Sequence, residues 1–173
     1  MKNYVKEGQK LPLYGVGPAI VFAMGAVTAV TITLCCCVLK NGILGGAWIP
    51  IFRVVGAALI AAGLAVWFIS ALRSDMDASI AENRLQTGGI YAWVRNPMYS
   101  GLWMLFAGIG LQWHNAWVLL TIPVNWAIMT IVLKGTEEKW LKGLYGQDYA
   151  DYLKRVNRCI LWPPRKARRE MNR

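Results

Sequence analysis

Long apolar runs separated by short polar connections dominate the amino-acid sequence. No residue between positions 11 and 39 is charged, and none between positions 96 and 133 is charged when His114 is counted as neutral. A helix that crosses a bilayer needs about 20 predominantly apolar residues. The pattern therefore predicts one span within residues 13–39 and a second span over about residues 48–72.

The uncharged block 96–133 predicts two further helices. Its sequence QWHN, at residues 112–115, breaks the block into two arms of roughly 16–18 residues, slightly short for a full crossing. We expect the arms to form a helical hairpin packed against the first two spans, with Pro123 kinking the second arm. The predicted fold class is all-α integral membrane, with about four transmembrane helices including this C-terminal helical hairpin.

The segment after the last apolar run is polar but keeps aromatic and aliphatic residues at helical spacing. Residues 136–156 predict two short amphipathic helices at the cytoplasmic surface, interrupted at Gly146. The basic sequence RKARRE, residues 165–170, suits a solvated tail near anionic lipid. No aromatic platform or groove-reading motif accompanies it, so no nucleic-acid partner is expected.

Composition agrees with a membrane protein, and the distribution of charge predicts its orientation in the bilayer. Of the 173 residues, 56% are hydrophobic and 16% are charged. Lys and Arg occur before residue 11, in the loop 73–95 and after residue 133, whereas the connections 41–50 and 112–116 carry none. Because cytoplasmic connections are enriched in Lys and Arg, we expect an integral protein of the cell membrane with both termini in the cytoplasm.

Three of the four cysteines, Cys35, Cys36 and Cys37, are adjacent within the first apolar run. Adjacent cysteines do not form a disulfide framework, and a metal site needs thiolates with matching partner ligands. We interpret them as small membrane-embedded hydrophobes and expect no metal site.

The sequence YAWVRNPMYSG, residues 91–101, concentrates polar and backbone-bending residues where the third helix should begin. Pro97 suits the first helical turn, and Asn96 before it is a natural N-cap. The free N–H groups of such a helix start bind carboxylates or phosphates, and Arg95 adds a fixed positive charge. Alternatively, Arg95 only follows the positive-inside rule and the tyrosines only anchor the interface.

Glu137 and Glu138 follow the fourth apolar helix and lie at the same membrane face as Arg95. A carboxylate beside a bilayer is costly unless it is paired, so it indicates a binding or functional role. Successive helical residues point about 100° apart, so we expect only one of the pair to face inward. The alternative is a solvated pair in the first turn of the tail helix. A cation, a helix start, aromatic rings and an inward carboxylate at one face suit a zwitterionic ligand that carries hydroxyls.

Three stretches together resemble one enzyme family. TGGIYAWVRNPMYSG, then EE, then YGQDYADYLKRV are similar to the pattern of the isoprenylcysteine carboxyl methyltransferases and their relatives, which include phospholipid N-methyltransferases. The resemblance covers about residues 83–158, and it implies S-adenosylmethionine as the methyl donor. The implied cofactor-binding residues are Asn83, Arg84, Leu85, Gln86, Tyr91, Asn96, Pro97, Met98, Tyr99, Glu137, Tyr149 and Tyr152, and the candidate catalytic residues are Arg95 and Lys134.

The resemblance and the residue types together suggest a role for each group. The helix start at Asn96 and Pro97 is expected to hold the cofactor carboxylate. Glu137 is expected to accept hydrogen bonds from the ribose hydroxyls or the amino group. Tyr91 or Tyr99 would lie near the sulfonium, where a ring face attracts a cation by about 0.5–2 kcal/mol. Tyr149 and Tyr152 would help close the cofactor pocket from below.

Two departures from the family pattern bear on the substrate. The usual histidine is Asn96 here, which can still cap and donate but does not titrate near neutrality. The arginine that the carboxyl methyltransferases carry four residues before the first glutamate is Leu133 here, and the neighbouring Lys134 points about 100° away on a helix. A carboxylate acceptor would therefore lack the planar, two-pronged partner that an arginine provides.

The sequence thus predicts an integral membrane methyltransferase that acts on a lipophilic acceptor, such as an isoprenylcysteine-type carboxylate, and whose partners are that lipid and the bilayer. A single domain is expected, with two N-terminal spans in residues 1–72 and the cofactor-binding region in residues 73–173. Two alternatives stay open. An NADPH-dependent membrane reductase of the sterol-reductase type would need more cationic contacts than the loop 73–95 offers, and a non-enzymatic membrane adaptor would have no cofactor affinity.

Overall fold

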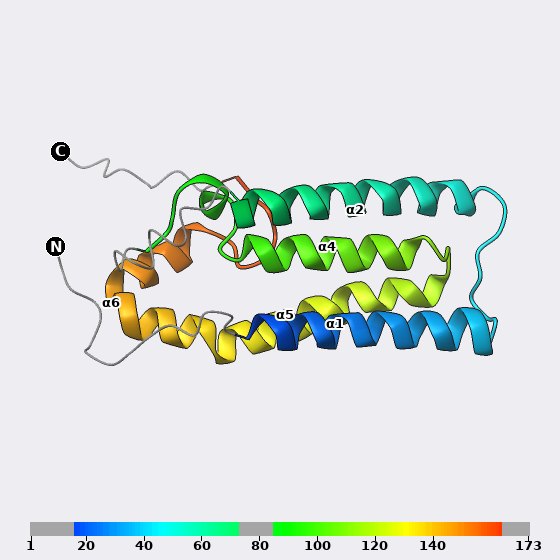
Figure 1. Ribbon diagram of the computed structural model, residues 1–173, viewed down its shortest axis with the longest axis horizontal. Coiled ribbons are helices and arrows are strands. Elements are labelled where there is room, and N and C mark those ends of the chain that lie inside the picture. Colours follow the sequence, from blue (N-terminus) through cyan, green and yellow to red (C-terminus); the bar gives the residue numbers. More distant parts are fainter. Residues whose placement is uncertain (1–15, 73–84, 164–173) are drawn as a thin grey trace.

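The computed structural model describes residues 16–72 and 85–163, which form helices joined by short connections. Figure 1 shows this part of the chain as four apolar helices lying side by side along the long axis, with α6 across one end. The elements are α1 (Gly17–Ile32), the π-helical turn η1 (Thr33–Val38), α2 (Trp48–Leu72), the 3₁₀ turn η2 (Gly89–Ala92), α4 (Pro97–Leu111), the 3₁₀ turn η3 (Ala116–Leu120), α5 (Thr121–Gly135) and α6 (Glu137–Arg155).

The predicted fold class is confirmed. Among the described residues, three helical stretches are long and apolar enough to cross a membrane: Gly17–Val38, Trp48–Leu72 and Ala116–Gly135. The other arm of the predicted hairpin, α4, is apolar but has 15 residues. The turn between the arms falls at residues 112–115, as predicted. Pro123 lies in the first turn of α5, where a missing N–H costs little, and the irregular geometry is the 3₁₀ turn just before it.

Helices α2 and α4 form the most extensive helix–helix contact, and glycines make it possible. Gly56 and Gly63 on α2 face Gly108 and Gly101 on α4. A Cβ at Gly63 would lie 2.6 Å from the Gly101 carbonyl oxygen, and a Cβ at Gly108 would lie 2.6 Å from the Gly56 carbonyl oxygen. The two backbones therefore approach closely and gain the van der Waals contact that drives helix association in lipid.

A second contact joins α1 to α5 and contains a buried polar pair. The Asn125 side-chain amide donates a hydrogen bond of 3.0 Å to the Thr28 hydroxyl, and that hydroxyl donates to the Met24 carbonyl within α1. The Trp103 indole N–H donates to the Ile122 carbonyl at 2.9 Å and joins α4 to α5. Such bonds satisfy polar groups that the bilayer interior cannot hydrate.

At the end of the bundle away from α6, the two connections between helices pair with each other. Ile43 and Asn115 form an isolated antiparallel bridge, and the Asn115 side-chain amide donates to the Asn41 carbonyl at 2.8 Å. Gly42, with a φ of +71°, lies against Trp117, whose ring would overlap a Cβ at this position. Glycine is therefore required both by the backbone conformation and by the space.

Helix α6 is amphipathic and bends at Gly146, as predicted. The φ of 54° and ψ of −121° at Gly146 interrupt the helix, and this backbone conformation favours glycine. The buried face of the helix and the residue that follows it form a separate core cluster of Leu144, Tyr145, Tyr149, Tyr152 and Val156. Helix α6 therefore covers the end of the bundle with an aromatic surface.

Candidate active site

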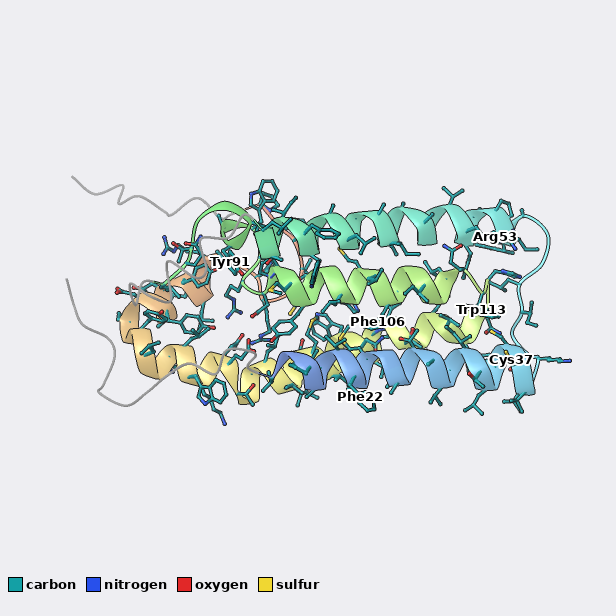
Figure 2. All side chains as sticks on the ribbon, viewed as in Figure 1. Phe22, Cys37, Arg53, Tyr91, Phe106 and Trp113 are labelled. Carbon is teal, nitrogen blue, oxygen red and sulfur yellow. The ribbon has the colours of Figure 1, made fainter. Side chains whose placement is uncertain are left out.

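The predicted site residues that the structure describes gather at the end of the bundle covered by α6. Tyr91 in η2 lies at this end, and Figure 2 shows Trp113 and Cys37 toward the other end of the bundle. The starts of α4 and α6 lie at the same end (Figure 1). Asn83 and Arg84 are outside the described residues. The remaining members of the predicted cofactor set therefore share one end of the bundle.

Glu137 faces the interior of the bundle and pairs with Tyr99. The Tyr99 hydroxyl donates a hydrogen bond of 2.7 Å to Oε1 of Glu137, and the backbone N–H of Val16 donates a long bond of 3.5 Å to the same oxygen. A Cβ at Gly17 would lie 3.3 Å from the Tyr99 hydroxyl, so Tyr99 also packs on the start of α1. Glu137 thus joins the starts of α1, α4 and α6.

Glu138 also faces the protein, where it lies between two arginines. Nη1 of Arg95 lies 3.0 Å from its Oε1, and Arg158 contacts both oxygens, with Nε 2.5 Å from Oε1 and Nη2 3.0 Å from Oε2. The prediction that only one carboxylate faces inward is wrong. Helix α6 begins directly after Thr136, whose φ of −124° and ψ of −84° are not helical. Its first turn has protein on two sides, so the two side chains bond to different segments. Glu137 contacts Tyr99 and Val16, whereas Glu138 contacts the two arginines.

The surrounding charges keep Glu138 ionised. Burial alone raises the pKa of a carboxyl, but the hydrogen bonds and charges of Arg158 and Arg95 outweigh burial and lower the pKa of Glu138 below its ordinary value. Two arginines and one carboxylate leave one excess positive charge. This charge lies beside the N-terminus of α4, and the combination favours an anionic group.

Asn96 precedes α4, but its side chain does not cap the helix as predicted. Its φ of −125° and ψ of 66° place it outside the helix, and no hydrogen bond runs from its side chain to the first turn of α4. Instead, its side-chain amide donates to the Arg158 carbonyl at 3.1 Å. This bond uses the amide donor and not the oxygen that an N-cap presents to the helix, and it ties the later segment to the helix start. Pro97 occupies the first helical turn, as predicted.

Buried tyrosines form a wall next to Arg95. The Tyr152 hydroxyl donates to the Tyr91 carbonyl at 2.6 Å, and the ring centres of Tyr149 and Tyr152 are 6.2 Å apart. Burial raises the pKa of Tyr149 to about 12, with the charge of Glu138 adding to the rise and that of Arg95 opposing it. Tyr149 and Tyr152 therefore stay neutral and present a mostly apolar surface with hydrogen-bonding edges.

Other predicted residues lie at the margin of this group. Leu85 packs against the aromatic cluster of α6, and Gln86 is half-buried. Met98 is exposed. Lys134 is exposed in the last turn of α5, and no ion pair joins it to the described site residues. Leu133 is fully buried in the core between α1 and α5, so an apolar side chain fills the position where the carboxyl methyltransferases carry an arginine.

Sequence reasoning missed the C-terminal strap, residues 157–162, which folds back beside the segment that precedes α4. The backbone N–H of Trp162 donates to the Trp93 carbonyl at 3.3 Å, and Cys159 is 3% exposed within the core of the bundle. The available signal is the apolar run Cys-Ile-Leu-Trp at residues 159–162, which a solvated tail would not contain. This strap brings Arg158 to the site.

A cleft of about 210 Å³ lies elsewhere, toward the opposite end of the bundle. Its lining residues are Val27, Thr31, Cys35, Trp117, Leu120, Thr121 and Val124. The hydroxyls of Thr31 and Thr121 donate to backbone carbonyls of their own turns. The cleft is therefore apolar, and it includes none of the predicted site residues.

Comparison with known proteins identifies the family of this chain. A model of the phospholipid methyltransferase family matches residues 51–148, more than half of the chain, and the match contains Tyr91, Tyr99 and Glu137. No curated protein and no solved structure gives a significant match. Members of the family are membrane methyltransferases with lipophilic acceptors, and they generally use S-adenosylmethionine. The chain belongs to the phospholipid methyltransferase family, within the group of membrane methyltransferases that also contains the isoprenylcysteine carboxyl methyltransferases.

Proposed function

We propose that this protein transfers a methyl group from S-adenosylmethionine to the amine of a membrane phospholipid, at the end of the bundle that α6 covers. The family match supports methyl transfer to a lipophilic acceptor and favours it over the reductase and the adaptor. Buried Leu133 favours an amine over an isoprenylcysteine-type carboxylate, because a carboxylate would find no cation at that position.

The described residues fit the zwitterionic end of the cofactor. The Arg95 side chain is 8% exposed, and its Nε has no hydrogen-bond partner among the described residues. A buried N–H without a partner is costly, so this donor and the start of α4 suit a carboxylate. Glu137 and Tyr99 would pair with hydroxyl and amino groups. When bound, the cofactor supplies a methyl carbon that its sulfonium has already activated.

The chain itself would contribute alignment and charge placement, which methyl transfer needs more than acid or base chemistry. Arg95 and the start of α4 would orient the bound cofactor. The hydrogen bond from Tyr99 would keep Glu137 pointing inward. The buried tyrosines of η2 and α6 would exclude water from one side. An ammonium acceptor must lose a proton before it attacks, and a site at the end of the bundle lets this proton leave to water.

The proposal also includes an orientation, with the protein in the cell membrane and both termini and the site facing the cytoplasm. Helix α6 carries Lys139, Lys142, Lys154 and Arg155, whereas the connections at the opposite end carry no Lys or Arg between residues 41 and 50 or 112 and 116. This asymmetry follows the positive-inside rule. The water-soluble cofactor would enter from the cytoplasm, and the lipid acceptor would enter sideways from the bilayer.

The observation that carries the choice of acceptor is the complete burial of Leu133, and labelling tests it. The purified protein is incubated with S-adenosylmethionine that carries a labelled methyl group and with a total lipid extract. We expect base-stable label on amine-bearing phospholipids, loss of label in Glu137→Gln, and retained label in the exposed control Lys154→Gln. Label released by mild base as methanol would identify a methyl ester and overturn the amine assignment. Absence of label from every lipid would overturn the proposed function.

A further inference from the structure

The C-terminal strap carries an arginine that lies beyond residue 148, where the family match ends. The backbone N–H of Arg95 donates to the Asn157 carbonyl at 2.9 Å, and that of Asn96 donates to the Arg158 carbonyl at 3.1 Å. The Asn96 side-chain amide donates to the same Arg158 carbonyl. The backbone of Arg158 is therefore fixed beside the start of α4.

The side chain of Arg158 meets Arg95 through a shared carboxylate. Its Nε and Nη2 bond to the two oxygens of Glu138, and this forked geometry sets the rotation of the carboxylate. Nη1 of Arg95 then donates to Oε1 of the same group at 3.0 Å. Arg95 is 8% exposed and Arg158 is 25% exposed. The more exposed arginine thus holds the carboxylate that orients the more buried one.

We propose that Arg158 is a positioning residue that acts through Glu138 to hold the Arg95 guanidinium in the orientation that binds the anionic end of the cofactor. This inference rests on the proposed function, in which Arg95 contacts the cofactor carboxylate. Lysine at position 158 would supply the charge without the planar fork. The role therefore requires arginine, and its effect on binding requires Arg95.

A double-mutant cycle on Arg95 and Arg158 tests the proposal, with binding of S-adenosylhomocysteine to the purified full chain as the readout. We expect Arg158→Gln to weaken binding about tenfold, the size of one hydrogen bond to a charged group. Arg158→Lys should recover part of this loss. In a chain that already carries Arg95→Gln, the change Arg158→Gln should add nothing, because it has nothing left to position.

Two controls separate positioning from folding. Lys154→Gln breaks an exposed ion pair with Asp151 on α6 and should bind like the wild type. Arg158→Lys should keep the wild-type unfolding midpoint while binding more weakly. Wild-type affinity in Arg158→Gln, or equal losses with and without Arg95→Gln, would overturn this inference alone. Failure of the wild type to bind S-adenosylhomocysteine would overturn the proposed function and this inference with it.

Discussion

The Tyr99 hydroxyl donates a hydrogen bond of 2.7 Å to Glu137, although the two residues are 38 positions apart in the chain. The bond joins the first turn of α4 to the first residue of α6. Between them, the hairpin of α4, η3 and α5 carries the chain to the opposite end of the bundle and back (Figure 1). Two motifs that the sequence separates thereby become two sides of one site.

The close approach of α2 and α4 makes Gly63 sensitive to the smallest side chain. A Cβ there would lie 2.6 Å from the Gly101 carbonyl oxygen and 2.8 Å from the Leu105 nitrogen, both backbone atoms that cannot easily yield. We expect Gly63→Ala to destabilise the protein by about 1–3 kcal/mol, the usual cost of overpacking. Unfolding in detergent, followed by circular dichroism, measures the change.

Gly143→Ala is the matched control for this substitution. Gly143 lies in α6, and a Cβ at this position would meet nothing within 4 Å beyond its chain neighbours and the nearby backbone of its own helix. Alanine favours a helix over glycine by about 0.8–1 kcal/mol, so the control should be neutral or slightly stabilising. Equal stability of both variants and the wild type would contradict the glycine-mediated contact between α2 and α4.

The buried pair of Asn125 and Thr28 should contribute to stability between α1 and α5. We expect Thr28→Ala and Asn125→Ala to show a coupling of about 0.6–2 kcal/mol in a double-mutant cycle, as for other interhelical hydrogen bonds in membranes. Thr31→Ala is the control, because the Thr31 hydroxyl bonds within its own helix. Additive effects in the cycle would show that the two side chains do not interact.

Glu138 should make stability depend on pH in the acid range. Its pKa is lowered in the folded protein from the ordinary value of 4.5, because its two arginine partners outweigh the effect of burial. A carboxyl with a depressed folded pKa stabilises the fold above its unfolded pKa, and this contribution is lost as the pH falls through the folded pKa. We expect the unfolding midpoint to fall as the pH drops below 4.5.

The same titration in Glu138→Gln should lack this part of the acid loss. Asp151→Asn removes a carboxyl whose ion pair with Lys154 is exposed, and its titration should follow the wild type because exposed pairs contribute little. If the unfolding midpoint of Glu138→Gln fell in acid as much as that of the wild type, Glu138 would not be a carboxylate that its two arginine partners stabilise.

The proposed orientation is tested by labelling introduced cysteines in intact cells. In a chain with Cys35, Cys36 and Cys37 changed to Ala and the buried Cys159 kept, Asn41→Cys and Gln147→Cys would place thiols at exposed positions at opposite ends of the bundle. A membrane-impermeant maleimide should label Asn41→Cys directly and Gln147→Cys only after permeabilisation. The reverse pattern would place the site outside the cytoplasm.

The helices could be predicted from the sequence because their causes are local. Uncharged runs of sufficient length identify the spans, QWHN identifies the turn between residues 111 and 116, and Gly146 interrupts α6. These signals depend on chain length, hydropathy and glycine conformation, all of which act within one segment. An inward carboxylate was also predicted, since an acidic residue beside lipid needs a partner, but the choice of Glu137 came from the family resemblance.

The parts that could not be predicted depend on contacts distant in the chain. The inward face of Glu138 requires Arg158, which lies on another segment. Asn96 is a suitable N-cap by local rules, yet its side chain makes no capping bond and its amide instead donates to the Arg158 carbonyl. The facing glycines of α2 and α4, such as Gly63 and Gly101, reflect a helix register that neither segment specifies alone.

Isothermal titration of S-adenosylhomocysteine into the purified wild-type protein and Glu137→Gln tests the central claim most directly. We expect the wild type to bind in the micromolar range and Glu137→Gln to bind at least about tenfold more weakly, because it loses a charged hydrogen-bond acceptor. Tyr99→Phe should show a smaller loss, and Lys154→Gln should show none. Absence of binding to the wild type, or unchanged affinity in Glu137→Gln, would contradict a cofactor site at the meeting of α4 and α6.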